Sequence, residues 1–147
     1  MKVIKSILIV IVMLAALGAA GFAYLAQSSK NGSAPGLVDG SLAPCPGSPN
    51  CVSSEAGTDS EKAVEPLPAG SWDALPAAIS AMGGVITAKS EEYIAAEFSS
   101  STFGFVDDLE LRRGEDAVHI RSASRVGYSD GGVNAKRVAE LRAKVEG

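Results

Sequence analysis

The sequence has 147 residues with a formal net charge of −4, and 46% of its residues are hydrophobic. All 17 acidic residues follow residue 26, so the rest of the chain is acidic overall. An acidic domain repels phosphate backbones, which argues against nucleic acid as a partner. The glycines form no phosphate-binding loop, and we expect no cofactor.

Residues 6–26 form an uncharged apolar segment, SILIVIVMLAALGAAGFAYLA. About 20 helical residues cross the hydrocarbon core of a bilayer, so residues 1–27 are predicted to contain a transmembrane anchor. Lys2 and Lys5 precede the segment and favour a cytoplasmic N-terminus. We therefore expect a single-pass protein of the cytoplasmic membrane. Its C-terminal domain would face the periplasm or the cell exterior.

A cleaved signal peptide is the alternative interpretation of this segment. Small residues at positions 18–20 and 21–23 suit a peptidase, although the apolar core of a signal peptide usually has about 7–15 residues. The next segment, residues 28–40, is rich in serine and glycine and predicts a flexible linker. Residues 41–147 then remain for one small domain.

The chain has two cysteines, Cys45 and Cys51, which enclose a short loop with two prolines. An even number of cysteines behind an export segment predicts a structural disulfide formed in an oxidising compartment. The pair lacks the Cys-x-x-Cys spacing that activates redox thiols. A zinc site needs three or four protein ligands, and His119 is the only histidine. We therefore predict a disulfide and no metal site.

The apolar pattern of the domain predicts an α+β fold. Two hairpins would supply a four-stranded antiparallel sheet, and one helix on each side of them in sequence would flank it. Ser71 is expected to cap the first helix, which Gly83 ends, and Asn134 to cap the last. The predicted strands are residues 85–89, 93–99, 103–112 and 117–124.

The second hairpin permits a prediction of strand register. If Arg113 pairs with Asp116, then Asp108 lies opposite Arg121. Alternation along both strands then places the apolar residues on one face and the charged residues on the other. The apolar face becomes polar at the end where the chain leaves the sheet.

Charged and aromatic residues near that end form the candidate site. Its members are Asp107, Asp108, Arg121, Arg125, Tyr128 and Asp130. Arginines four residues apart on an extended strand point to the same side, about 13 Å apart. The acidic residues would neutralise them and hold the 126–133 loop, or the arginines would bind an anionic or polar ligand with Tyr128 as a wall. Catalysis is a third interpretation. We name no catalytic residue, because only His119 could serve as a histidine base.

Three sequence blocks resemble a known family. They are CPGSPNCVSS at residues 45–54, FVDD at 105–108 and RSASRVGYSDGGVN at 121–134 followed by Arg137. These blocks are similar to those of the bacterial and plastid proteins grouped as domain of unknown function 1499. Lys62 stands where many members are expected to carry histidine, and Gly131 where a bulkier residue is common. The resemblance implies no particular reaction.

We therefore predict a membrane-anchored extracytoplasmic binding or assembly module. Its partners would be the membrane, through residues 6–26, and an unidentified anionic or polar ligand or a protein. The alternative is an enzyme that holds an anionic small molecule through Arg121 and Arg125. An enzyme predicts an unpaired arginine at the floor of a pocket of several hundred Å³. A module predicts that both arginines are ion-paired.

Overall fold

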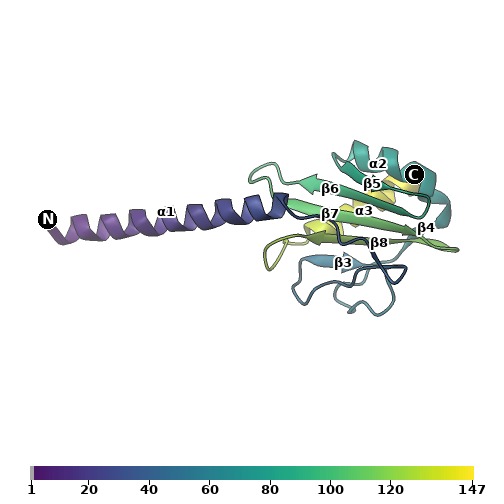
Figure 1. Ribbon diagram of the computed structural model, residues 1–147, viewed down its shortest axis with the longest axis horizontal. Coiled ribbons are helices and arrows are strands. Elements are labelled where there is room, and N and C mark those ends of the chain that lie inside the picture. Colours follow the sequence, from purple (N-terminus) through teal and green to yellow (C-terminus); the bar gives the residue numbers. More distant parts are fainter. Residues whose placement is uncertain (1) are drawn as a thin grey trace.

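The computed structural model describes residues 2–147 and consists of a long N-terminal helix followed by an α+β domain (Figure 1). The helix, α1 (Lys2–Lys30), extends away from the domain, and Val3–Lys30 is long and apolar enough to cross a membrane. Within residues 2–147 it is the one helix that meets this criterion.

The domain is built on an antiparallel sheet of six strands, two more than the sequence predicted. The strand order is β3-β8-β7-β6-β5, and β4 also pairs with β8. The bounds are β3 (Cys51–Ser53), β4 (Leu67–Pro68), β5 (Val85–Lys89), β6 (Tyr93–Ser99), β7 (Val106–Arg113) and β8 (Ala117–Ser124). The prediction missed β3 and β4 because strands of two or three residues are too short to show alternation.

Three helical segments and a two-stranded ribbon complete the domain. They are β1 (Leu37–Val38), β2 (Ser41–Leu42), the 3-10 helix η1 (Ala69–Ala74), α2 (Leu75–Ala81) and α3 (Val133–Glu146). α2 and α3 contact each other and cover one face of the sheet, while β2 lies against β7 and β8 on the other (Figure 1). The main core lies under the helices and includes Leu75, Ile79, Leu109, Leu111, Ile120, Val138 and Leu141, all buried.

Both predicted helix caps were wrong. Ser71 lies inside η1 and donates a hydrogen bond to the Pro68 carbonyl, and α2 begins only at Leu75. Asn134 lies inside α3, with its side chain buried beneath the helix. The free amides at the start of α3 are instead satisfied by Asp130, whose carboxylate accepts hydrogen bonds from Gly132 N and Asn134 N at 2.9 and 2.8 Å.

The predicted register of the second hairpin was wrong by two residues. The turn closes through a hydrogen bond from Gly114 N to Ala117 O, one residue further along than expected. Glu110 is therefore the residue opposite Arg121, and Asp108 lies opposite Ala123. A two-residue shift leaves every side chain on its original face. The prediction of one apolar and one charged face is thus confirmed, although the pairing is not.

The C-terminal end of α1 joins the sheet directly. The helix continues to Lys30, beyond the boundary expected at residue 27. Ser29 is fully buried. Its hydroxyl donates to Val106 O at 3.2 Å and accepts from Val106 N at 2.6 Å. These two bonds fix the last turn of α1 to the first residue of β7.

Candidate functional site

The predicted disulfide is confirmed. Cys45 and Cys51 are bonded, with their Cα atoms 5.6 Å apart. The bond closes the loop before β3 and attaches it to the edge of the sheet. The buried ammonium group of Lys62 donates to the Pro46 carbonyl inside this loop. The lysine at position 62 therefore has a structural contact that braces the same loop.

We expect the disulfide to stabilise the domain. In the loop-entropy model, closing so short a loop contributes about 2–3 kcal/mol. The double variant Cys45→Ser/Cys51→Ser should lower the free energy of unfolding by that amount in urea denaturation. Thiol labelling of the folded, unreduced protein should find no free cysteine. Two reactive thiols in protein recovered from outside the cytoplasm would contradict the assignment.

Arg125 binds three groups at the end of the sheet. Its guanidinium makes two bonds to the Asp108 carboxylate, Nε to Oδ2 at 2.9 Å and Nη2 to Oδ1 at 2.6 Å. Nη2 also donates to Glu97 Oε1 at 2.6 Å, and Nη1 to the Ser29 carbonyl at 3.0 Å. The hydrogen bond to Asp108 is the main reason why the pKa of Arg125 is raised. Arg125 thus links two neighbouring strands to the last turn of α1.

Arg121 has a separate carboxylate partner. Its Nη1 donates to Glu110 Oε2 at 2.8 Å, and the Glu110 side chain is completely buried. Glu110 Oε1 also accepts from Tyr93 Oη at 2.7 Å and from Gly36 N at 2.9 Å. Burial and the bond to Glu110 raise the pKa of Tyr93. Arg121 Nε is the one buried side-chain nitrogen or oxygen without a partner in the part of the chain that the structure describes.

These contacts define one cluster, which we call the arginine network. It consists of Arg121, Arg125, Glu97, Asp108 and Glu110 on the face opposite α2 and α3. It binds the Ser29 carbonyl in the last turn of α1 and the Gly36 amide in the segment that follows α1. The network therefore attaches this segment to the sheet.

The other predicted site residues lie elsewhere. Asp107 points to the opposite face from Asp108, as adjacent strand residues must, and binds Arg137 Nη2 at 2.7 Å. Tyr128 is 77% exposed in the loop after β8. The Asp130 carboxylate accepts hydrogen bonds from backbone amides at the start of α3. Burial would raise the pKa of Asp130, but the amide hydrogen bonds from Asn134 and Gly132 outweigh burial and lower it. The structure thus divides the predicted cluster between two faces and a loop.

A second polar cluster lies under α3. Asn134 Oδ1 accepts from Ser122 Oγ at 2.7 Å and from Arg137, and its Nδ2 donates to Asn50 O and Ser124 Oγ, each at 3.1 Å. This cluster explains the polar end of the otherwise apolar face. It connects α3, β8 and the disulfide loop.

Sequence reasoning missed Ser29, Glu97, Glu110 and Asn134 as parts of these clusters. The correct hairpin register would have identified Glu110, which lies opposite Arg121. Glu97 lies opposite Asp108 on β6, so extending that register to β6 would have found it too. Nothing in the local sequence distinguishes Ser29 from its neighbours in the serine-rich segment.

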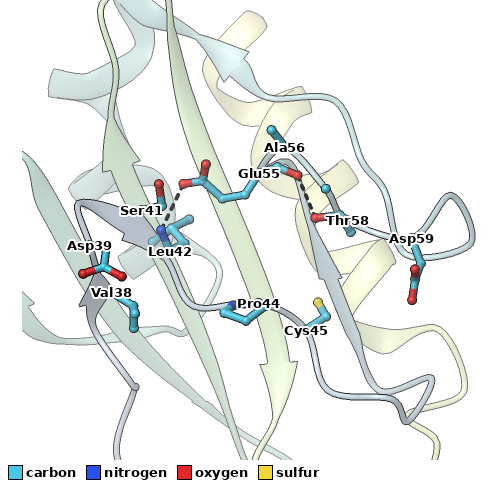
Figure 2. Close-up of a pocket in the computed structure, with 11 residues that line it drawn as sticks. Val38, Asp39, Ser41, Leu42, Pro44, Cys45, Glu55, Ala56, Thr58 and Asp59 are labelled. Atoms are coloured by element: carbon cyan, nitrogen blue, oxygen red, sulfur yellow. Dashed lines mark hydrogen bonds between the residues drawn. The ribbon is translucent and has the colours of Figure 1, made fainter.

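A pocket of about 390 Å³ lies beside the disulfide loop, between residues 38–45 and 55–59 (Figure 2). Glu55 supplies the carboxylate at the centre of this pocket. That carboxylate already accepts hydrogen bonds from Leu42 N at 3.0 Å and from the Arg112 guanidinium at 2.8 and 3.0 Å. Burial would raise the pKa of Glu55, yet these bonds lower it. Asp39 and Asp59 lie apart at opposite ends of the pocket (Figure 2). Its charged groups therefore do not converge on a ligand.

Residues 2–147 contain no group of three or more histidine, cysteine, aspartate or glutamate side chains arranged to hold a metal ion.

The chain is an α+β domain behind an apolar N-terminal helix, with paired arginines on one face of its sheet. It belongs to the family described as proteins of unknown function, DUF1499, whose model matches residues 41–145. The match begins at β2 and ends inside α3, so it excludes α1 and β1. Neither the curated proteins nor the solved structures include a significant match.

Proposed function

We propose that this protein is a membrane-anchored extracytoplasmic module that works by binding or assembly, with its domain held against the membrane surface. The observation that carries the proposal is the joint between α1 and the sheet. Ser29 is buried against Val106 and its carbonyl accepts from Arg125. If α1 spans the bilayer, a helix joined in this way would hold the domain in one position relative to it.

The location outside the cytoplasm rests on two features. Lys2 and Lys5 before the apolar segment favour a cytoplasmic N-terminus. The Cys45–Cys51 disulfide is typical of an oxidising compartment. Both features favour the periplasm or the cell exterior for residues 31–147.

The pairing of both arginines supports a binding or assembly role over an enzyme. An anionic substrate at Arg121 or Arg125 would have to displace Glu110 or Asp108, which are themselves buried. The displaced carboxylate would keep its desolvation cost without its partner.

If α1 spans the bilayer, the edge of the domain nearest to α1 would face the membrane. The loop from β6 to β7 and the loop from β8 to α3 lie at the α1 end, whereas the β5–β6 turn lies at the far end (Figure 1). Ser101 and Ser90, both exposed, mark the near and far ends. These two serines provide matched positions for a test.

Depth quenching in vesicles tests this arrangement. Both native cysteines are bonded, so Ser101→Cys and Ser90→Cys each introduce a single reactive thiol for a fluorophore. We expect nitroxide-headgroup lipids to quench the label at position 101 much more strongly than the label at position 90. Adding Arg125→Gln should reduce the difference, because the joint loosens. Equal quenching at both positions would show that the domain does not rest on the bilayer.

Orientation requires a second measurement. Protease added to spheroplasts should digest the C-terminal domain and leave the original N-terminus in the membrane fraction. A soluble protein that begins near residue 24 would instead show that the apolar segment is a cleaved signal peptide.

A further inference from the structure

An apolar pocket lies where α1 meets the domain. It has a volume of about 330 Å³, and Phe22 and Leu25 of α1 form one wall. Phe105, Val126 and Val133 form much of the opposite wall, so the 126–133 loop closes the pocket on the domain side. The volume falls within the range of about 300–1,000 Å³ typical of small-molecule sites.

Aromatic contacts hold this junction in place. The ring of Phe22 packs edge-to-face against Phe103 at 4.7 Å and Phe105 at 5.0 Å, measured between ring centroids. Phe22 and Leu25 nevertheless remain 42% exposed each. The pocket therefore combines a fixed aromatic wall with apolar surface that nothing in residues 2–147 covers.

The position of the pocket along α1 points to its occupant. Phe22 and Leu25 belong to the apolar segment of residues 6–26. At a rise of 1.5 Å per helical residue, Phe22 lies about 6 Å along the helix axis before the C-terminal end of that segment. If α1 crosses the membrane, the pocket lies at the boundary between hydrocarbon and headgroups. A ligand there enters from the bilayer.

The surrounding charges agree with a phospholipid. Lys30 lies at the end of α1, and its side chain packs against Gly104. A Cβ atom built on Gly104 would lie 3.3 Å from the Lys30 ammonium nitrogen. This places a cation over the 100–105 loop, where lipid phosphates would lie. The Asp130 carboxylate at the pocket rim is occupied by the amides of Gly132 and Asn134.

We propose that this pocket holds one acyl chain of a membrane phospholipid from the leaflet on the domain side. The inference rests on the proposed membrane anchoring and adds a ligand class to it. An acyl chain would cover the exposed surface of Phe22 and Leu25 and contact Val126 and Val133, and burial of this apolar surface supplies the binding energy. The lipid would then be part of the joint between α1 and the domain.

Photocrosslinking of the full-length protein tests the proposal. The protein is reconstituted in vesicles of phosphatidylethanolamine and phosphatidylglycerol that contain phosphatidylglycerol with a diazirine on one acyl chain. After irradiation, adducts are mapped by peptide mass spectrometry. We expect adducts on α1 and also on the 126–133 loop.

Two variants fill the pocket, and one serves as a matched control. Val126→Trp and Val133→Trp enlarge two partly exposed side chains that line the pocket. Each should reduce the lipid adducts on the 126–133 loop several-fold and leave the adducts on α1 unchanged. Val85→Trp alters an exposed valine of β5, outside the pocket, and should change neither. Thermal unfolding establishes that the variants are folded.

The remaining outcomes separate the two proposals. Adducts on α1 without adducts on the wild-type loop would overturn the acyl-chain site and leave the anchoring intact. Loop adducts that persist unchanged in both folded tryptophan variants would also overturn the site, because they would reflect surface contact with lipid. Absence of adducts on α1 itself would overturn the anchoring and the site together.

Discussion

Glu110→Ala is expected to lower the free energy of unfolding by about 3–5 kcal/mol, the cost of leaving one member of a buried ion pair alone. Glu110 is fully buried, and its carboxylate accepts from Arg121, Tyr93 and Gly36. All three donors would lose their acceptor at once. Urea denaturation followed by circular dichroism measures the effect.

A double-mutant cycle shows whether the loss arises from the pair. If Arg121 serves Glu110, then Glu110→Ala/Arg121→Ala should cost little more than either single variant, because no buried charge remains unpaired. Asp107→Ala is the control. Asp107 lies on the other face of the sheet and binds Arg137, so its effect should add to that of Arg121→Ala. If Arg121→Ala alone leaves stability unchanged or raises it, the structural role is wrong and ligand binding becomes the better account.

Asn134→Ala is expected to destabilise the domain by about 3 kcal/mol or more, since each buried polar group left without a partner costs about 1–3 kcal/mol. The Asn134 amide is fully buried and bonded to Ser122, Ser124, Arg137 and the Asn50 carbonyl. Its removal would disconnect α3 from β8 and from the disulfide loop. Chemical denaturation measures the loss directly.

Lys136→Ala provides the control for Asn134→Ala. Lys136 lies two residues further along α3 and is exposed, so we expect its substitution to change stability by less than about 0.5 kcal/mol. If Asn134→Ala were as mild as Lys136→Ala, the buried polar cluster would not hold α3 in place. The position of α3 would then depend on its apolar residues Val138 and Leu141 and on the ion pair between Arg137 and Asp107.

Local patterns predicted much of the fold. Strands 85–89, 93–99 and 117–124 match β5, β6 and β8, because alternation over five or more residues is a strong signal of a half-buried strand. The disulfide followed from two cysteines with no other partner. The apolar segment predicted a helix long enough to cross a membrane, since length and composition alone decide that property.

Alternation along the strands is enough to predict which face of the sheet is charged, but the ion-pair partners on that face depend on how the strands are paired. Alternation repeats every two residues, so the register with Asp108 opposite Arg121 and the register with Glu110 opposite Arg121 satisfy it equally. The turn closed by Gly114 and Ala117 selects the second. The contacts of Arg125 with Glu97 and Ser29 depend on strand order and on where α1 ends. These contacts join residues that are far apart in the sequence. No local pattern in residues 28–40 indicates that Ser29 would take part in them.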